Sequence, residues 1–149
     1  MTSVFVDSNV VIYAFDRTDR TKHAAAKAWL SRLAASRTLT MSVQVPNEVY
    51  ATLTLRHGLH PVADGVRDAL APLGRWVKAP LTFDVVTSAW LLQDRFQVRI
   101  WDALLLASAN AASCDYFLSE DLNDGRRYGD VAVLNPFRHA PEDVLGPPA

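Results

Sequence analysis

Short apolar runs with the composition of β-strands alternate along this chain with segments whose apolar residues repeat at helical spacing. The strand-like runs occupy 3–7, 39–43, 75–80, 115–119 and 131–135. The helical segments occupy 8–14, 20–35, 46–57, a weaker stretch after 61, 82–96 and 102–112. Such alternation is typical of an α/β domain in which crossover helices join parallel strands. We therefore expect a single α/β domain over 1–138, with helices flanking a largely parallel sheet, and an irregular Pro- and Gly-rich tail over 139–149.

Composition narrows the class of protein further. The 149 residues are 50% hydrophobic, which is enough for one sizeable core. The formal net charge of −1 lacks the basic excess of a passive nucleic-acid-coating protein. The single cysteine, Cys114, excludes an internal disulfide framework and a cysteine-based zinc site. No apolar stretch approaches the ~20 residues that cross a bilayer, so we expect a cytoplasmic protein without membrane contact.

Four carboxylates, Asp7, Glu48, Asp102 and Asp121, each lie beside an apolar segment and have no Lys or Arg directly next to them. An isolated buried carboxylate is costly, so it is normally paired, hydrogen-bonded or bound to a metal. Taken singly, Asp7 and Asp102 could be helix N-caps and Asp121 a turn residue. Glu48 cannot belong to a capping box, because Val rather than Ser or Thr lies three residues earlier.

The predicted topology brings these four acids together. In a parallel α/β sheet, a helix begins at the edge where the preceding strand ends. Asp7 ends the first strand, and Glu48 lies in the first turn after the second. Asp102 opens the helix that leads to the fourth strand, and Asp121 follows that strand. All four are therefore expected at the carboxyl edge of the sheet, where open α/β folds bind their ligands.

A cluster of oxygen ligands suits Mg²⁺ or Mn²⁺, which retain several waters and share phosphate oxygens with a substrate. One or two such ions can activate a water and stabilise the leaving oxygen in phosphodiester hydrolysis. Other cofactor motifs are absent from the sequence. It contains neither GxxxxGK[ST] nor a GxGxxG after a strand, and its four histidines lack HExxH-type spacing.

The segments around the acids also carry recognisable motifs. They read Asp7-Ser8-Asn9 before VVIYAF, Asn47-Glu48 in QVPNEVYATL, Trp101-Asp102 before ALLLASA, and Ser119-Glu120-Asp121 before LND. Together these motifs resemble those of the PIN-domain family and, within it, the VapC-like toxins of bacterial toxin–antitoxin pairs. The resemblance covers nearly the whole chain.

This resemblance implies a PIN-like nuclease domain with a five-stranded parallel sheet ordered 3-2-1-4-5. It implies a Mg²⁺- or Mn²⁺-dependent endoribonuclease that acts as the toxin of a type II toxin–antitoxin system. The residues that match the catalytic, metal-binding acids of the family are Asp7, Glu48, Asp102 and Asp121. Those that match its polar, hydrogen-bonding positions are Ser8, Asn9 and Ser119. Asp124 matches an extra acid that occurs in some such proteins.

The resemblance also implies partners: a small cognate antitoxin, an RNA substrate and a second copy in a homodimer, with DNA contacted only through the antitoxin. We expect some apolar residues to form the dimer or antitoxin surface, among Val11, Tyr13, Ala14, Trp29 and Val49. The basic residues that we consider as phosphate contacts are Arg17, Arg20, Lys22, Arg126 and Arg127.

Two other classes of protein compete with this interpretation. A non-catalytic PIN-like or receiver-like module would use the acidic pocket to bind a partner. A receiver needs a Lys near the late strands, whereas no Lys follows Lys78, and a degenerate PIN domain would lack one of the acids. A structure-specific DNA nuclease of the flap type carries extra DNA-binding segments, for which 149 residues leave little room.

Overall fold

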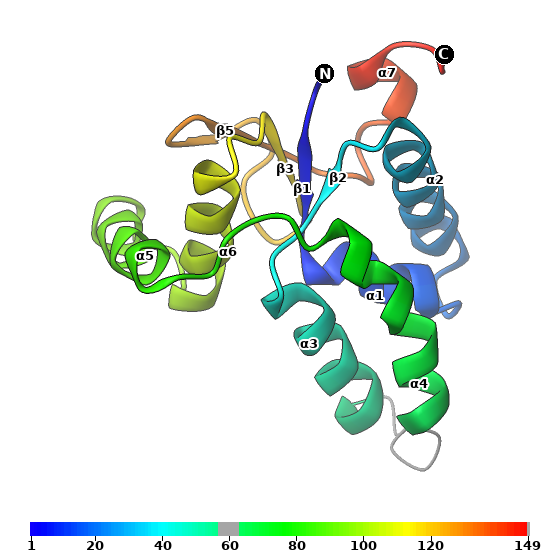
Figure 1. The fold of residues 1–149 in the computed structure, drawn as a ribbon. Helices are drawn as coiled ribbons and strands as arrows, with labels where there is room; N and C mark the ends of the chain where they lie inside the picture. The colour runs from blue at the N-terminus through cyan, green and yellow to red at the C-terminus, as the bar shows by residue number, and fades with distance from the viewer. Residues whose placement is uncertain (57–62, 149) are drawn as a thin grey trace.

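A small twisted sheet lies between two groups of helices in the computed structural model, which describes residues 1–56 and 63–148 (Figure 1). The strands are β1 (Val4–Val6), β2 (Leu39–Thr40), β3 (Tyr116–Leu118), β4 (Arg127–Tyr128) and β5 (Val131–Leu134). Helices α1 (Ser8–Phe15) and α2 (Arg20–Ser36) pack together on one side of the sheet. Helices α5 (Phe83–Phe96) and α6 (Ile100–Ala111) pack together on the other.

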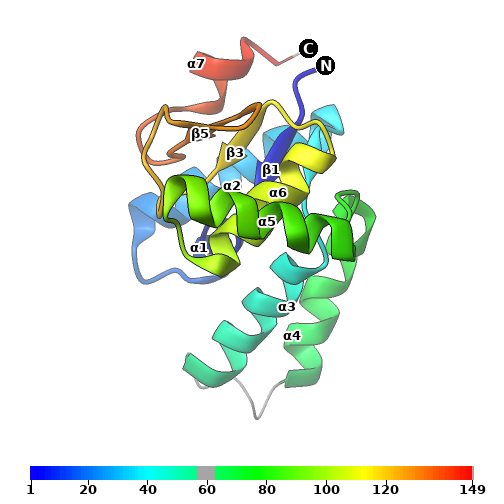
Figure 2. The same cartoon turned by 90° about the vertical axis from the view of Figure 1, so that its left-hand side faces the viewer.

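A helical pair extends from the carboxyl edge of the sheet (Figure 2). It consists of α3 (Gln44–Ala51), which continues as a π-helix over Thr52–Arg56, and α4 (Ala63–Leu70). A 3₁₀ helix over Ala71–Trp76 follows α4. The predicted end of the 46–57 helix, at position 57, lies outside the described residues. The predicted weaker helix after 61 begins, within the described part, at Ala63.

The sheet has the order β2-β1-β3-β5-β4, and β4 pairs antiparallel with β5. The five-stranded α/β architecture is confirmed, but the fully parallel order 3-2-1-4-5 is wrong at both edges. The predicted strand at 75–80 is reduced to a single parallel bridge between Met41 and Val77, because the 3₁₀ helix extends to Trp76 and Pro80 cannot donate to a ladder. At the opposite edge, the sheet gains β4, an antiparallel strand that was not predicted.

A two-residue turn at Gly129 and Asp130 forms this antiparallel edge. Gly129 has a φ of +68°, which suits a short hairpin turn. The Asn110 side chain of α6 donates to Tyr128 O (2.9 Å) and accepts from Asp130 N–H (2.9 Å). A Cβ at position 129 would meet the Asn110 side chain at 2.5 Å. The turn therefore depends on glycine for both its backbone conformation and its close contact with α6.

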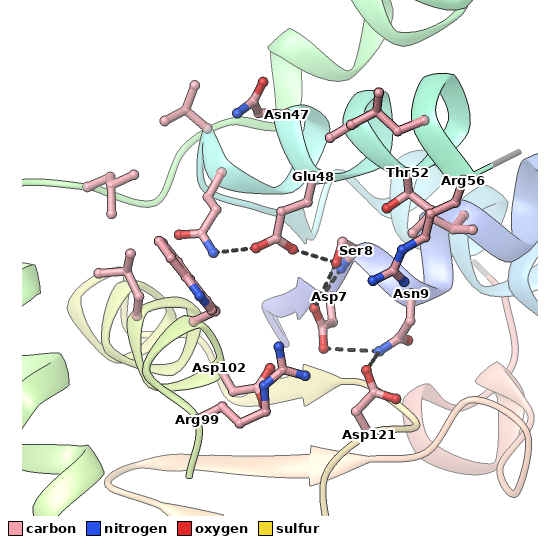
Figure 3. A pocket seen from close by; sticks show the side chains of 18 residues that line it. Asp7, Ser8, Asn9, Asn47, Glu48, Thr52, Arg56, Arg99, Asp102 and Asp121 are labelled. Carbon is pink, nitrogen blue, oxygen red and sulfur yellow. Dashed lines mark hydrogen bonds between the residues drawn. The ribbon is translucent and has the colours of Figure 1, made fainter. Parts of the chain in front are cut away.

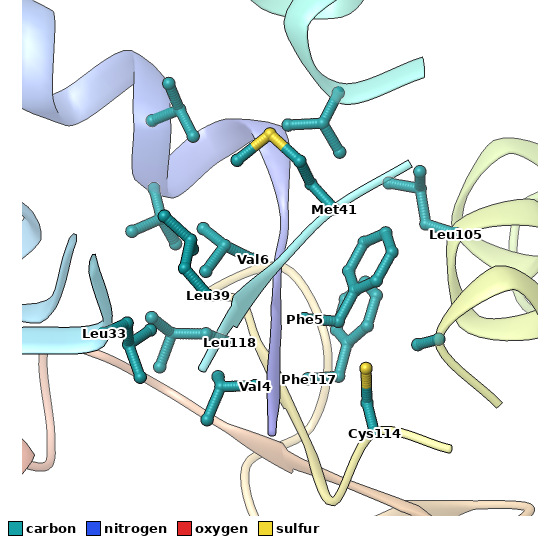
Figure 4. Close-up of a cluster of buried hydrophobic side chains, with 14 of the residues drawn as sticks. Val4, Phe5, Val6, Leu33, Leu39, Met41, Leu105, Cys114, Phe117 and Leu118 are labelled. Carbon is teal, nitrogen blue, oxygen red and sulfur yellow. The ribbon is translucent and has the colours of Figure 1, made fainter. Parts of the chain in front are cut away.

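The sheet core is made of fully buried strand side chains (Figure 4). The rings of Phe5 in β1 and Phe117 in β3 stack with their centroids 5.3 Å apart. Cys114 lies buried beside them, as a small apolar side chain would, and burial raises the pKa of its thiol. Because helices cover both faces of β1, all three of its residues are buried.

The predicted apolar docking surface is wrong for three of its five residues, because these three are buried. Val11, Trp29 and Val49 are at most 1% exposed and belong to the core, and Tyr13 and Ala14 pack against it. The Trp29 indole N–H, moreover, donates to His139 O (2.9 Å) and Pro136 O (3.2 Å). The large apolar side chains that the structure exposes lie elsewhere, and they include Val43, Leu55, Phe83, Trp90, Leu91 and Trp101.

The C-terminal segment is more ordered than its composition suggests. Instead of an irregular tail, residues Pro141–Leu145 form α7, which packs on α2. Proline at the start of α7 suits the first helical turn, where an N–H would lack a partner. Arg32 of α2 donates to Leu145 O (3.4 Å) at the end of α7. Within 1–56 and 63–148, no helix is both long and apolar enough to cross a membrane.

Candidate functional site: a carboxylate pocket at the edge of the sheet

The four predicted acids line one pocket of about 920 Å³ at the carboxyl edge of the sheet (Figure 3). Asp7 directly follows β1, and Asp121 lies in the loop after β3. Glu48 projects from α3 and Asp102 from the first turn of α6. The topological argument from the sequence therefore placed all four side chains at the correct edge.

Asp7 is the most deeply buried of the four, at 3% exposure. Its Oδ1 accepts from Ser8 N–H (2.7 Å), so Asp7 caps α1. Its Oδ2 accepts from the Ser119 hydroxyl (2.7 Å). Burial raises the pKa of Asp7 to about 7; the Ser119 bond lowers it, and the charge of Asp102 raises it again. The helix cap and the pocket acid are thus the same side chain.

A chain of hydrogen bonds connects three of the acids through the uncharged residues Ser8 and Asn9 (Figure 3). The Ser8 hydroxyl donates to Glu48 Oε2 (2.7 Å), and the Gln44 amide donates to Glu48 Oε1. The Ser8 N–H donates to Asp7 Oδ1, and from Asp7 the chain continues through the Asn9 amide to Asp121. The three predicted polar partners, Ser8, Asn9 and Ser119, therefore each donate a hydrogen bond to a pocket acid.

The Asn9 amide lies between two carboxylates. Its Nδ2 donates to Asp7 Oδ2 (3.1 Å), Asp121 Oδ2 (3.0 Å) and Ser119 Oγ (3.1 Å). Its Oδ1 is buried without a hydrogen-bond partner in the described part of the chain. The Asn9 amide thus joins Asp7 to Asp121 by hydrogen bonds.

Asp102 faces the other acids across the pocket and is not a helix cap, since the N-cap of α6 is Arg99. Burial raises the pKa of Asp102; the charge of Arg99 lowers it, and the charges of Asp121 and Glu48 raise it. The charge of Asp102 in turn raises the pKa of Asp7. The acids are therefore close enough to interact electrostatically.

The donor set fits a hard divalent cation. Within 1–56 and 63–148, no three Asp, Glu, His or Cys side chains are grouped closely enough to enclose one ion. Mg²⁺ does not need such a cage, because it usually keeps several waters and uses one or two carboxylates. Four carboxylates, in a lining whose described residues include no lysine, supply the oxygen chemistry that Mg²⁺ and Mn²⁺ prefer.

Asp124 does not line this pocket. Its Oδ1 accepts from Asn135 N–H (2.8 Å), and its Oδ2 contacts His139 Nε2 (2.8 Å). Burial raises the pKa of Asp124, but the bonds from Asn135 and His139 outweigh burial and lower it. The position of Asp124 thus indicates an anchor for the C-terminal segment.

Two arginines that were not predicted as phosphate contacts, Arg56 and Arg99, line the pocket and approach it from opposite sides (Figure 3). The five basic residues that were predicted as phosphate contacts are absent from the described lining. Lys22, for example, pairs with Glu120 (2.8 Å). A usable signal was the position of Arg99 three residues before Asp102, which places both at the start of one helix.

Comparison with known proteins identifies one family. Residues 4–129 match the family described as PIN domain. No curated protein is significantly similar to the chain.

Proposed function

This chain belongs to the PIN-domain family, and from that membership and its carboxylate pocket we propose that it is a Mg²⁺- or Mn²⁺-dependent endoribonuclease. PIN domains are generally metal-dependent nucleases. The observation that carries the proposal is the gathering of Asp7, Glu48, Asp102 and Asp121 around one pocket. A purely structural set of caps and turn residues would not need to face a common cavity.

In this proposal the four acids surround the cation: one or two of them bind it directly, and the others contact its bound waters. When bound, the cation supplies an activated water and stabilises the leaving oxygen of the cleaved phosphodiester. Metal ligands must be deprotonated, so Asp7, whose pKa is about 7 without metal, releases its proton on binding. The hydroxyls of Ser8 and Ser119 fix the orientation of Glu48 and Asp7. Asn9 holds Asp121 near Asp7.

We extend the proposal to the biological role: a type II toxin whose activity is held in check by a small antitoxin, and which forms a homodimer. The support is the set of four motifs that resemble VapC-like toxins. A small reading frame that overlaps the gene from upstream would favour this role. Expression of the chain alone should then arrest growth, and co-expression of the neighbouring product should restore it.

The enzymatic part is tested by incubating purified protein with labelled RNA in Mg²⁺, Mn²⁺, Ca²⁺ or excess EDTA. We expect cleavage in Mg²⁺ or Mn²⁺, little in Ca²⁺, and none in EDTA. Asp121→Asn should abolish cleavage, and Asp94→Asn, an exposed acid of α5 outside the pocket, should not. RNA cleavage that continues undiminished in EDTA would refute the metal requirement. A wild-type protein that binds RNA but never cuts it would instead favour the non-catalytic binding module.

A further inference from the structure

One rim of the carboxylate pocket carries an exposed tryptophan. Trp101 lies in the first turn of α6, directly before Asp102, and lines the pocket with 58% of its surface exposed. Neither of the two buried apolar clusters in the described part of the chain includes it. Trp29, by contrast, is fully buried with its indole N–H bonded to backbone carbonyls. Packing of the fold therefore does not account for an indole at position 101.

The same pocket contains two guanidinium groups. Arg99 and Arg56 are both exposed and are the basic side chains among the lining residues that the structure describes. A guanidinium offers a planar fork of donors that matches phosphate oxygens. Arg99 comes two residues before Trp101 in the sequence. Arg56 lies across the carboxylates from Arg99 (Figure 3). Phosphate-binding groups thus lie on both sides of the acids.

An exposed aromatic surface beside phosphate-binding groups is the combination that binds single-stranded nucleic acid. Inside a duplex, each base is stacked on both faces by its neighbours, so an indole can stack on it only after the base is displaced. An unpaired base has no such cost. Val43 (55% exposed) and Leu55 (76%) are further exposed apolar side chains that line the pocket.

We propose that Trp101 is a stacking platform for an unpaired nucleobase of the substrate, while Arg99 and Arg56 contact backbone phosphates on the two sides of the acids. Trp101 is then a determinant of specificity that directs the enzyme to loops and single strands. This inference rests on the proposed nuclease function, because it takes the substrate to be RNA. It goes beyond that function by naming the side chain that contacts the base.

The test measures binding separately from cleavage. A short labelled RNA of mixed sequence, either single-stranded or annealed to its complement, is titrated with full-length protein in Ca²⁺, and anisotropy gives the Kd. Trp101→Ala should weaken single-strand binding about 5- to 150-fold, because one base–aromatic stack is worth about 1–3 kcal/mol. Duplex binding should change little. Trp101→Phe should stay near the wild-type Kd, whereas Trp101→Leu, apolar but not aromatic, should resemble Trp101→Ala.

The control is Trp90→Ala, which removes a 49% exposed tryptophan of α5 outside the pocket and should leave both Kd values unchanged. The stacking proposal is overturned if Trp101→Ala binds the single strand as tightly as wild type, if it loses duplex binding equally, or if Trp101→Leu behaves like Trp101→Phe. It is also overturned if the wild type does not bind single-stranded RNA.

The binding readout keeps the two proposals distinguishable. Trp101-dependent binding of single strands by a protein that cuts no RNA in Mg²⁺ or Mn²⁺ would support the platform and refute the nuclease. RNA cleavage with an unchanged Kd and unchanged kcat/KM in Trp101→Ala would support the nuclease and refute the platform.

Discussion

Replacing Asp7 by Asn should stabilise the metal-free protein at neutral and alkaline pH. The folded protein raises the pKa of Asp7 from 3.8 to about 7, chiefly because the carboxyl is buried. The native state therefore binds this proton more tightly than the unfolded chain. Between these two pKa values stability decreases as pH rises, and above about 7 the full cost of the buried charge is present. Asn carries no charge and avoids this cost.

The magnitude follows from the same shift. Each pKa unit corresponds to about 1.4 kcal/mol, so the buried charge costs at most about 4 kcal/mol. Asn has one acceptor oxygen, whereas both Asp7 oxygens accept hydrogen bonds, from Ser8 and Ser119. Loss of an acceptor costs about 1–3 kcal/mol at every pH. The variant should thus be about 1–3 kcal/mol more stable than wild type above the Asp7 pKa and about 1–3 kcal/mol less stable near pH 4.

Urea denaturation in EDTA, followed by circular dichroism at several pH values, measures this difference. The free energy of unfolding of Asp7→Asn minus that of wild type should rise by about 1.4 kcal/mol per pH unit between about pH 5 and pH 7. The slope does not depend on the hydrogen-bond loss, which is the same at each pH. Parallel stability curves for the two proteins would refute the claim that Asp7 is a buried, destabilising charge.

Three further results are expected. Asn9→Ala removes the amide between Asp7 and Asp121, so it should lower the melting temperature in EDTA and much less in Mg²⁺; an equal loss in both buffers would contradict the bridging role. Gly129→Ala should destabilise the protein by more than about 1 kcal/mol, because φ is positive and Asn110 crowds the new Cβ. Light scattering at micromolar concentration should detect a dimer or a complex with the neighbouring gene product; a strict monomer that binds neither speaks against the proposed partners.

The sequence was sufficient to predict those strands and helices that have a clear local pattern of apolar residues. The buried runs of β1, β3 and β5 and the amphipathic pattern of α5 were predicted within a few residues. Asp7 and Asp121 follow from this directly, because each comes just after a strand. Glu48 and Asp102 required the additional rule that helices of a parallel sheet begin at its carboxyl edge.

The sequence did not predict the features that depend on contacts between residues far apart in the chain. The two-residue strand β4 exists because Asn110, distant in sequence, bonds to both sides of its turn. Burial of Val11 and Trp29 depends on which helix covers which face, and the apolar pattern of one helix cannot reveal that. The pocket arginines were missed because exposed arginines carry no periodic signal, and only the folded chain brings Arg56 opposite Arg99.

The central claim, that four distant acids form one cation site, is tested most directly by titrating the protein with Mn²⁺ in a calorimeter. Wild type and Asp94→Asn should bind with the same affinity. Single substitutions of Asp7, Asp102 and Asp121 to Asn, and of Glu48 to Gln, should each weaken binding, because each removes one of the negative charges that attract the cation to the pocket. Binding that is unchanged in all four pocket variants would contradict the claim.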